Sequence, residues 1–281
     1  MPTYSTTGPV DVAVNLQVGS LRVAASDRTD AVVTVSPTDP AKAVDRRAAE
    51  DTRVEFDGMR ITVTSPRPRF SLVGPFESLD VTIEVPAGSR LTAEIGQGCA
   101  RTTGTLGATR IKASGGWVEV DEAADLWVRA GHGAATIGTT RGTLEVTADH
   151  GQIKVGAVTG DAALKASHGS ITIGQAGGEV EAKLSYGDLD IDRAAASVTA
   201  KTAYGSVRIG EASGGALELE SGYGAVTVGV RRGVPAWLDL SSKNGRVRNQ
   251  LDGDGAPAPG ERTVAVRART QFGDITVQRA Q

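Results

Sequence analysis

The sequence contains a single cysteine, Cys99, and only 4% of its 281 residues are aromatic. One cysteine excludes an internal disulfide framework, and we expect Cys99 to be buried as a small apolar side chain rather than to act as a reactive thiol. The scarcity of large rings, with 40% hydrophobic residues, favours a core of small aliphatic side chains. A globular core built around aromatic residues is therefore not expected.

Neither sign of charge dominates, because 33 acidic and 30 basic residues give a net charge of −3. Without a basic stripe, we expect no nucleic-acid partner and no anionic membrane surface as partner. The first thirty residues also lack an uninterrupted apolar run, since polar residues such as Asp11, Gln17 and Arg22 break it. We therefore expect no signal peptide, no membrane insertion and a cytoplasmic location.

Motifs of known catalytic chemistry are absent as well. The sequence has no Gly-x-Ser-x-Gly elbow, Walker loop, zinc cluster of cysteines or dinucleotide fingerprint. Gly222-x-Gly224 precedes a strand pattern, whereas a phosphate-binding loop needs a following helix. We therefore expect neither enzymatic activity nor a cofactor.

Glycine is abundant, with 36 residues, and six glycines form a repeat. Each of the six follows a His or Tyr, and successive glycines are 18, 18, 18, 18 and 19 residues apart. A period near twenty residues is typical of a solenoid, in which each repeat buries its apolar face against its neighbours. The six pairs are His132-Gly133, His150-Gly151, His168-Gly169, Tyr186-Gly187, Tyr204-Gly205 and Tyr223-Gly224.

Apolar residues alternate at the same offsets on both sides of each glycine, as Val146, Ala148, Ile153 and Val155 do around Gly151. Period two predicts strands with one buried face, so each repeat reads as a strand, a glycine corner, a second strand and a turn. The corner favours glycine because a sharp turn at positive φ excludes a Cβ. The predicted corners are Gly116, Gly133, Gly151, Gly169, Gly187, Gly205, Gly224, Gly245 and Gly273, with a weaker one at Gly98.

These patterns predict an all-β, single-domain parallel β-solenoid, or β-helix, of about ten rungs of roughly 18 residues each. A left-handed hexapeptide helix needs an aliphatic residue at every sixth position, but Thr159 and Lys165 stand six and twelve residues after Ile153. We therefore favour an irregular, right-handed solenoid.

The regular register begins near residue 90. Residues 1–90 are expected to form an irregular β cap, continuous with the solenoid, which protects the unpaired strands of its end. This cap contains one rung-like unit around Gly19, a short helix within residues 38–52 and a hairpin with its turn at Asp57-Gly58. Residues 91–281 form the repeat region, in which residues 263–277 are expected to make the closing rung.

The segments Val81–Gly88, Leu238–Leu240 before Asn244-Gly245, and Thr270–Val277 resemble the bacterial β-strand-repeat family of unknown function labelled "putative adhesin". The resemblance covers nearly the whole chain and implies stacked short strands without established catalytic residues. Because the chain shows no export signal, a cytoplasmic scaffold in the style of the polymer-forming bactofilins is a competing interpretation, by analogy of fold only.

The residue before each corner glycine defines the candidate site. Stacked rungs lie roughly 4.8 Å apart, so the six side chains should form a surface ladder whose rings stack and fix the register. A metal site of the three histidines is the alternative, although rungs so far apart would hold zinc poorly. Carbohydrate or peptide stacking along the tyrosines is a further alternative. The ladder residues are His132, His150, His168, Tyr186, Tyr204 and Tyr223.

A second candidate is the acidic row of Asp188, Asp190 and Asp192, whose side chains alternate with Leu189 and Ile191 and should point outward. Such rows bind calcium or catalyse hydrolysis in some β-helix proteins, but the calcium-binding nonapeptide is missing. We interpret the row as a solvated strand face, and Asp252-Gly-Asp254 as a turn.

The sequence thus predicts a non-enzymatic interaction or adhesin-like module that presents flat repeat faces to an unidentified protein or polymer partner. A self-assembling cytoplasmic scaffold is the alternative, and a carbohydrate-active β-helix enzyme is a distant third. Homo-oligomer formation is left open by the sequence.

Overall fold

The computed structural model describes residues 3–66, 77–251 and 262–280. The chain forms two compact units, Met1–Thr139 and Thr140–Gln281. In both units most strands pair in parallel with the neighbouring turn of the chain, which confirms the expected all-β parallel solenoid. The Asp252–Asp254 turn lies outside the described residues, and the handedness of the coil stays a prediction.

The first unit contains the only helix of the described chain, α1 (Ala43–Asp51). Its strands are β1 (Thr3–Ser5), β2 (Asp11–Ser26), β3 (Asp30–Pro37), β4 (Arg53–Phe56), β5 (Arg60–Thr64), β6 (Leu79–Pro86), β7 (Arg90–Leu106), β8 (Thr109–Gly115), β9 (Val118–Ala123), β10 (Leu126–His132) and β11 (Ala135–Thr140).

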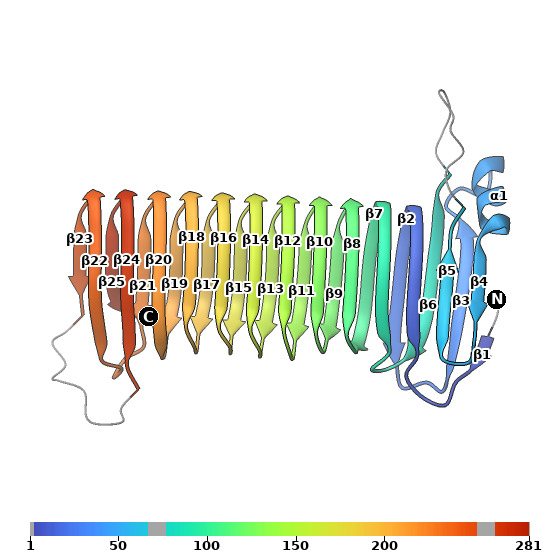
Figure 1. Ribbon diagram of the computed structural model, residues 1–281, viewed down its shortest axis with the longest axis horizontal. Coiled ribbons are helices and arrows are strands. Elements are labelled where there is room, and N and C mark those ends of the chain that lie inside the picture. The colour runs from blue at the N-terminus through green and yellow to red at the C-terminus, as the bar shows by residue number, and fades with distance from the viewer. Residues whose placement is uncertain (1–2, 67–76, 252–261, 281) are drawn as a thin grey trace. The chain divides into compact units, whose positions relative to one another are not determined.

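In the second unit each rung consists of two strands joined at a glycine corner (Figure 1). Its strands are β12 (Leu144–His150), β13 (Ile153–Val158), β14 (Ala162–His168), β15 (Ile171–Ala176), β16 (Val180–Tyr186), β17 (Leu189–Ala194), β18 (Val198–Tyr204), β19 (Val207–Ala212), β20 (Gly215–Tyr223), β21 (Val226–Val230), β22 (Ala236–Asn244), β23 (Val247–Gln250), β24 (Val264–Phe272) and β25 (Ile275–Arg279).

The core consists of columns of aliphatic side chains, one from each rung. The first inward position after the corner shows the pattern, because its residues pair in register and are at most 1% exposed. Each such side chain contributes about 1.5–3 kcal/mol through burial, as an upper bound. This column contains Ile153, Ile171, Leu189, Val207, Val226 and Ile275.

The order of the last rungs corrects the expectation from the sequence. Strand β24 pairs with β20 on one edge and with β22 on the other, and β25 likewise lies between β21 and β23. Residues 263–277 are therefore not the closing rung. They lie between the rung of β20 and β21 and the rung of β22 and β23, and the latter is the outermost rung of this unit (Figure 1).

The first unit shows the same arrangement at its beginning. Strand β2 pairs in parallel with β7 from Asp11–Arg90 to Ala24–Thr103. Its other edge pairs with β5 and then with β6. The first long strand is thus an internal rung, so parallel stacking extends into the first 90 residues.

Antiparallel strands cover the outer side of this rung. Strand β3 pairs antiparallel with both β1 and β6, and β4 pairs antiparallel with β5. The β4–β5 turn contains Asp57, which accepts hydrogen bonds from the N–H groups of Met59 and Arg60 at 3.0 and 2.7 Å. The expected hairpin is therefore confirmed.

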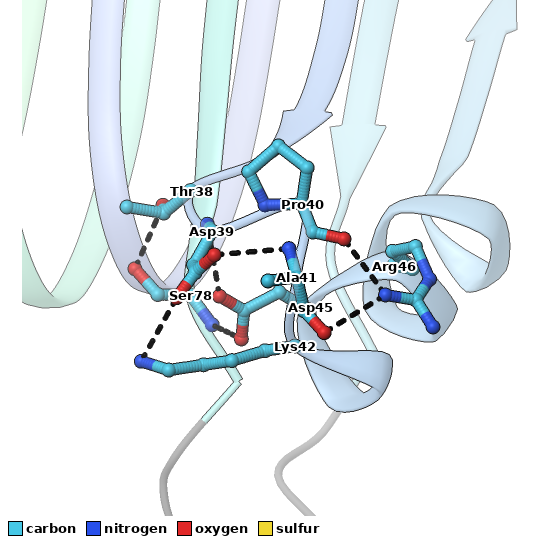
Figure 2. Close-up of polar contacts among 8 residues, drawn as sticks. All are labelled: Thr38, Asp39, Pro40, Ala41, Lys42, Asp45, Arg46 and Ser78. Carbon is cyan, nitrogen blue, oxygen red and sulfur yellow. Dashed lines mark hydrogen bonds and ion pairs between the residues drawn. The ribbon is translucent and has the colours of Figure 1, made fainter.

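Helix α1 lies within the segment expected to be helical and is held by a buried carboxylate, that of Asp45 (Figure 2). Asp45 is 1% exposed, and its two oxygens accept the N–H groups of Asp39 and Ser78, each at 3.1 Å. The hydroxyls of Thr38 and Ser78 lie 3.0 Å apart beside it. Because a buried carboxylate needs such donors, these contacts connect α1 to the ends of β3 and β6.

Candidate functional site

A continuous column of rings occupies the corner of the second unit. Neighbouring rings are nearly parallel, with interplanar angles of 2–7° and centroids 4.8–5.1 Å apart. This spacing equals that of paired strands, because each ring comes from the same position of successive rungs. The members of this ring column are His150, His168, Tyr186, Tyr204, Tyr223 and Phe272.

The ring column presents ring edges to solvent. Tyr186, Tyr204 and Tyr223 are 51%, 48% and 49% exposed, and Phe272 is 44% exposed. Because each inner ring is covered on both faces by its neighbours, this exposure belongs to the edges, where the tyrosine hydroxyls are. The arrangement offers a row of hydroxyls and imidazole nitrogens with a repeat of about 5 Å.

Backbone hydrogen bonds set the register of the ring column. Within the ring column, the N–H of a corner glycine donates to the carbonyl of the ring residue in the next rung, as Gly169 does to Tyr186 at 2.9 Å and Gly187 to Tyr204 at 2.8 Å. The same bond joins Gly224 to Phe272 at 2.9 Å. The rings are therefore aligned by the main chain and not only by contacts between side chains.

The corner glycines have the backbone geometry that the sequence led us to expect. Gly169 has φ +141°, and a Cβ built there would lie 2.1 Å from the carbonyl oxygen of Gly151. Gly245 differs, since its φ is not in the positive range. Glycines at positive φ in the predicted corners are Gly98, Gly116, Gly133, Gly151, Gly169, Gly187, Gly205, Gly224 and Gly273.

Hydroxyl groups just inside the corner support four of these turns. Two residues before the ring position, Thr202, Ser221 and Thr270 donate to the carbonyl oxygens of Gly187, Gly205 and Gly224 at 3.2, 2.9 and 3.1 Å. In the outermost rung Ser242 donates to the carbonyl of Gly273 at 2.9 Å. These bonds satisfy corner carbonyls where the backbone is not regular sheet.

Sequence reasoning missed Phe272 as a member of the ring column. It precedes Gly273, so the rule that found the other members would have included it, but the rule was applied only to His and Tyr. His132, which was included, ends β10 in the first unit, where its carbonyl accepts the N–H of Gly116 at 2.7 Å. The next rung in the second unit carries Asn244 at the ring position, in register with Phe272.

The acidic row of Asp188, Asp190 and Asp192 lies on an exposed strand face and has partners in the next rung. Asp188 accepts the N–H of Ser206 at 2.6 Å. Arg208 reaches Asp190 at 2.7 Å and Asp192 at 3.6 Å, and hydrogen bonding to Asp190 raises the pKa of the Arg208 guanidinium. The row is solvent-exposed, as expected for a solvated strand face, since the side chains of Asp190 and Asp192 are 40% and 62% exposed, and a cation of the next rung pairs with two of its carboxylates.

Among the described residues, no group of three or more His, Cys, Asp or Glu side chains is arranged to hold a metal ion. Cys99 is half-buried rather than fully buried, because it follows the corner glycine Gly98 and not an inward strand position. Desolvation raises the pKa of its thiol. Within the described ranges, no helix is long and apolar enough to cross a membrane.

Three crystal structures are similar to this chain. A "putative adhesin" from Bacteroides fragilis is 15% identical, with 98% of this chain and 95% of that chain covered and a TM-score of 0.38. A "putative adhesin" from Parabacteroides merdae is 11% identical, with 100% and 95% covered and a TM-score of 0.32. A "putative cell adhesion protein" from Clostridium sporogenes is 11% identical, with 99% and 98% covered and a TM-score of 0.22.

No curated protein matches the sequence significantly. The family model described as Toastrack DUF4097 matches residues 12–281. This match spans both units, including the inserted rungs at β2 and β24. The chain therefore belongs to the Toastrack DUF4097 family.

Proposed function

We propose that the protein is a non-enzymatic, adhesin-like interaction module that binds a protein or polymer partner along the ring column. The observation that supports this proposal is the half-exposed state of its tyrosines, Tyr186, Tyr204 and Tyr223. Aromatic residues with a polar tip are enriched where proteins bind partners, because one side chain supplies both apolar area and a hydrogen bond.

The geometry favours a partner that lies along the column rather than one that inserts into it. Ring faces 4.9–5.0 Å apart, from Tyr186 to Tyr223, leave no room for a sugar ring between them. A partner would instead contact ring edges and hydroxyls, and a partner with a regular repeat could bond to successive rungs. On a repetitive surface of this kind, many weak contacts made at once give a stable complex.

Residues near the ring column contribute charge without an excess of either sign. Lys165, Lys183 and Lys201 pair in register three residues before the rings. Two of them are already neutralised, since Lys183 contacts Glu181 and Lys201 lies 3.1 Å from Glu220. Hydrogen bonding to Lys183 lowers the pKa of Glu181. We therefore expect polar and apolar contacts, rather than net charge, to dominate recognition.

The proposal is tested with two triple variants of the three tyrosines. Replacing all three by Phe keeps the stack, as Phe272 shows that a phenyl ring fits, but removes the hydroxyls. Replacing them by Ala removes both. Co-sedimentation with peptidoglycan sacculi, cellulose and chitin, and cross-linking to proteins of the source cells, would measure binding. We expect binding by the natural chain, weaker binding by the Phe variant and none by the Ala variant, whereas equal binding by all three would refute the proposal.

Two finer expectations from the sequence remain proposals. We infer that residues 1–90 act as the cap of the solenoid and residues 91–281 as its repeat region; the antiparallel β1, β3 and β4 support this division. The cytoplasmic location is tested by cell fractionation, in which recovery of the protein outside the cytoplasm would contradict it.

A further inference from the structure

The outermost rung of the second unit has an unpaired edge. Among the described residues, β22 pairs only with β24, and β23 pairs only with β25. The N–H and C=O groups on the far edge of both strands therefore face no other described strand. Unpaired edges of this length are templates for pairing with a further strand.

Side chains at this edge are exposed where equivalent ones are buried. Val247 is 46% exposed, whereas Ile275, its partner in β25, is 0% exposed. Leu238 and Leu240 are half-buried, whereas their partners Val266 and Ala268 are 2% and 0% exposed. The apolar columns of the core thus continue to the last rung of this unit, and no described residues cover them there.

Trp237 adds to the apolar surface at the same edge. It is 66% exposed, and it lies beside Leu238 in a shallow groove shared with Ala265 and Ala216. Exposed clusters of this kind mark interaction sites more often than single exposed residues do. The strand therefore combines an open backbone edge with an anchor residue of the type that dominates interfaces.

We propose that this edge binds a second copy of the chain, with the two β22 strands antiparallel about a two-fold axis. Full overlap of the nine residues Ala236–Asn244 places Leu240 opposite itself at the centre of the strand. In that register Trp237 lies opposite Lys243 of the second copy, and the same pair recurs on the other side of the axis. Each ammonium group can then lie against an exposed indole, which is a favourable cation–π arrangement.

A second copy fits better than continued stacking in one direction. Parallel, in-register addition of another β22 would place Trp237 beside Trp237 and Lys243 beside Lys243, and would therefore lose both Trp237–Lys243 contacts. Head-to-tail growth would require an open parallel edge at the start of the chain, but the β5–β6 rung there is already paired with β3 and β4. The result is a closed dimer and not a filament.

The mass in solution tests this arrangement directly. Light scattering coupled to size-exclusion chromatography should give twice the 28.9 kDa chain mass for the natural protein at high concentration. Lys243→Glu should shift the dimer to monomer, since it removes both cation–π pairs. Lys165→Glu makes the same charge change on an interior rung and should leave the dimer intact. A natural protein that is monomeric at all concentrations, or that forms filaments, would overturn the proposal.

The register is tested by a single cysteine on the two-fold axis. Leu240→Cys in a Cys99→Ser background should form a covalent dimer when oxidised with copper phenanthroline, because the two Cβ atoms of opposite residues lie about 4.5–5.5 Å apart. Lys165→Cys in the same background should not. The triple tyrosine variants should remain dimeric, so loss of partner binding and loss of the dimer can be told apart. Absence of the cross-link in a Leu240→Cys protein that is still dimeric would refute the register.

Discussion

Replacing a corner glycine by alanine should cost much more stability than replacing a positive-φ glycine that faces open space. Gly169 and Gly233 both have positive φ, at +141° and +76°. A Cβ at Gly169 would lie 2.1 Å from the carbonyl oxygen of Gly151, whereas one at Gly233 would meet nothing within 4 Å. Both variants therefore introduce strain at positive φ, and only Gly169→Ala adds a clash with the neighbouring rung.

The magnitudes follow from these two terms. Strain at positive φ costs about 1–3 kcal/mol, and this is the whole expected effect of Gly233→Ala. Gly169→Ala must also displace the Gly151 carbonyl and disturb the 2.9 Å bonds that Gly151 and Gly169 donate at this corner. Loss of both bonds adds roughly 1–3 kcal/mol, so the total should be about 2–6 kcal/mol.

Urea unfolding followed by circular dichroism measures both variants against the natural chain, with the denaturant slope checked for constancy. Gly8→Ala is a useful baseline, because Gly8 has neither positive φ nor a close neighbour. Its midpoint should not change. Equal midpoints for Gly169→Ala and Gly233→Ala would refute the reasoning, since they would show that the rungs do not approach as closely as the contact with Gly151 requires.

Three further outcomes are expected. A double-mutant cycle of Tyr186→Ala and Tyr204→Ala should give a coupling of about 0.5–1.5 kcal/mol in the free energy of unfolding, and zero coupling would contradict stacking as a stabilising contact. A chelator should leave the melting temperature unchanged, because the parallel imidazoles of His150 and His168 do not converge on one point; a decrease that His150→Ala abolishes would contradict this. The pKa of Asp274 is lowered, first by the hydrogen bond that it accepts from the N–H of Arg246 and then by the charge of Arg248. The stability that Asp274 gives to the β23 rung is therefore fully present above the usual aspartate range, and it is lost as pH falls through the lowered pKa. Hydrogen-exchange protection of β23 should therefore fall in acid, and the same fall in Asp274→Asn would show that another group is responsible.

The columns of the core could be predicted from the sequence because two simple periods coincide. Alternation places Ile153, Val155 and their equivalents inward, and the 18-residue period stacks them. The order of rungs could not be predicted in the same way. Every rung presents the same inward pattern, so Leu217 fits beside Val266 as well as beside Leu238, and only the three-dimensional connection decides between them.

The burial and pairing of polar residues could not be predicted from the sequence either. Asp45 reads as a surface residue on a short helix, because carboxylates are rarely buried. Its burial depends on N–H groups of Asp39 and Ser78, which come from two different loops and leave no local signal. Similarly, the pairing of Arg208 with Asp190 and Asp192 follows from rung stacking, not from the acidic row itself.

The internal position of β24 has a consequence for synthesis on the ribosome. Strands β22 and β23 are translated before β24 and β25, yet among the described residues they pair only with these later strands. The rungs of this unit therefore cannot be added one by one in the order of translation, and the next-to-last segment has no described partner until the final segment arrives. A chain that terminates after Gln250 would lack an inner layer rather than an outer one. Its β20 and β21 strands would lack β24 and β25, which pair with them in the complete chain.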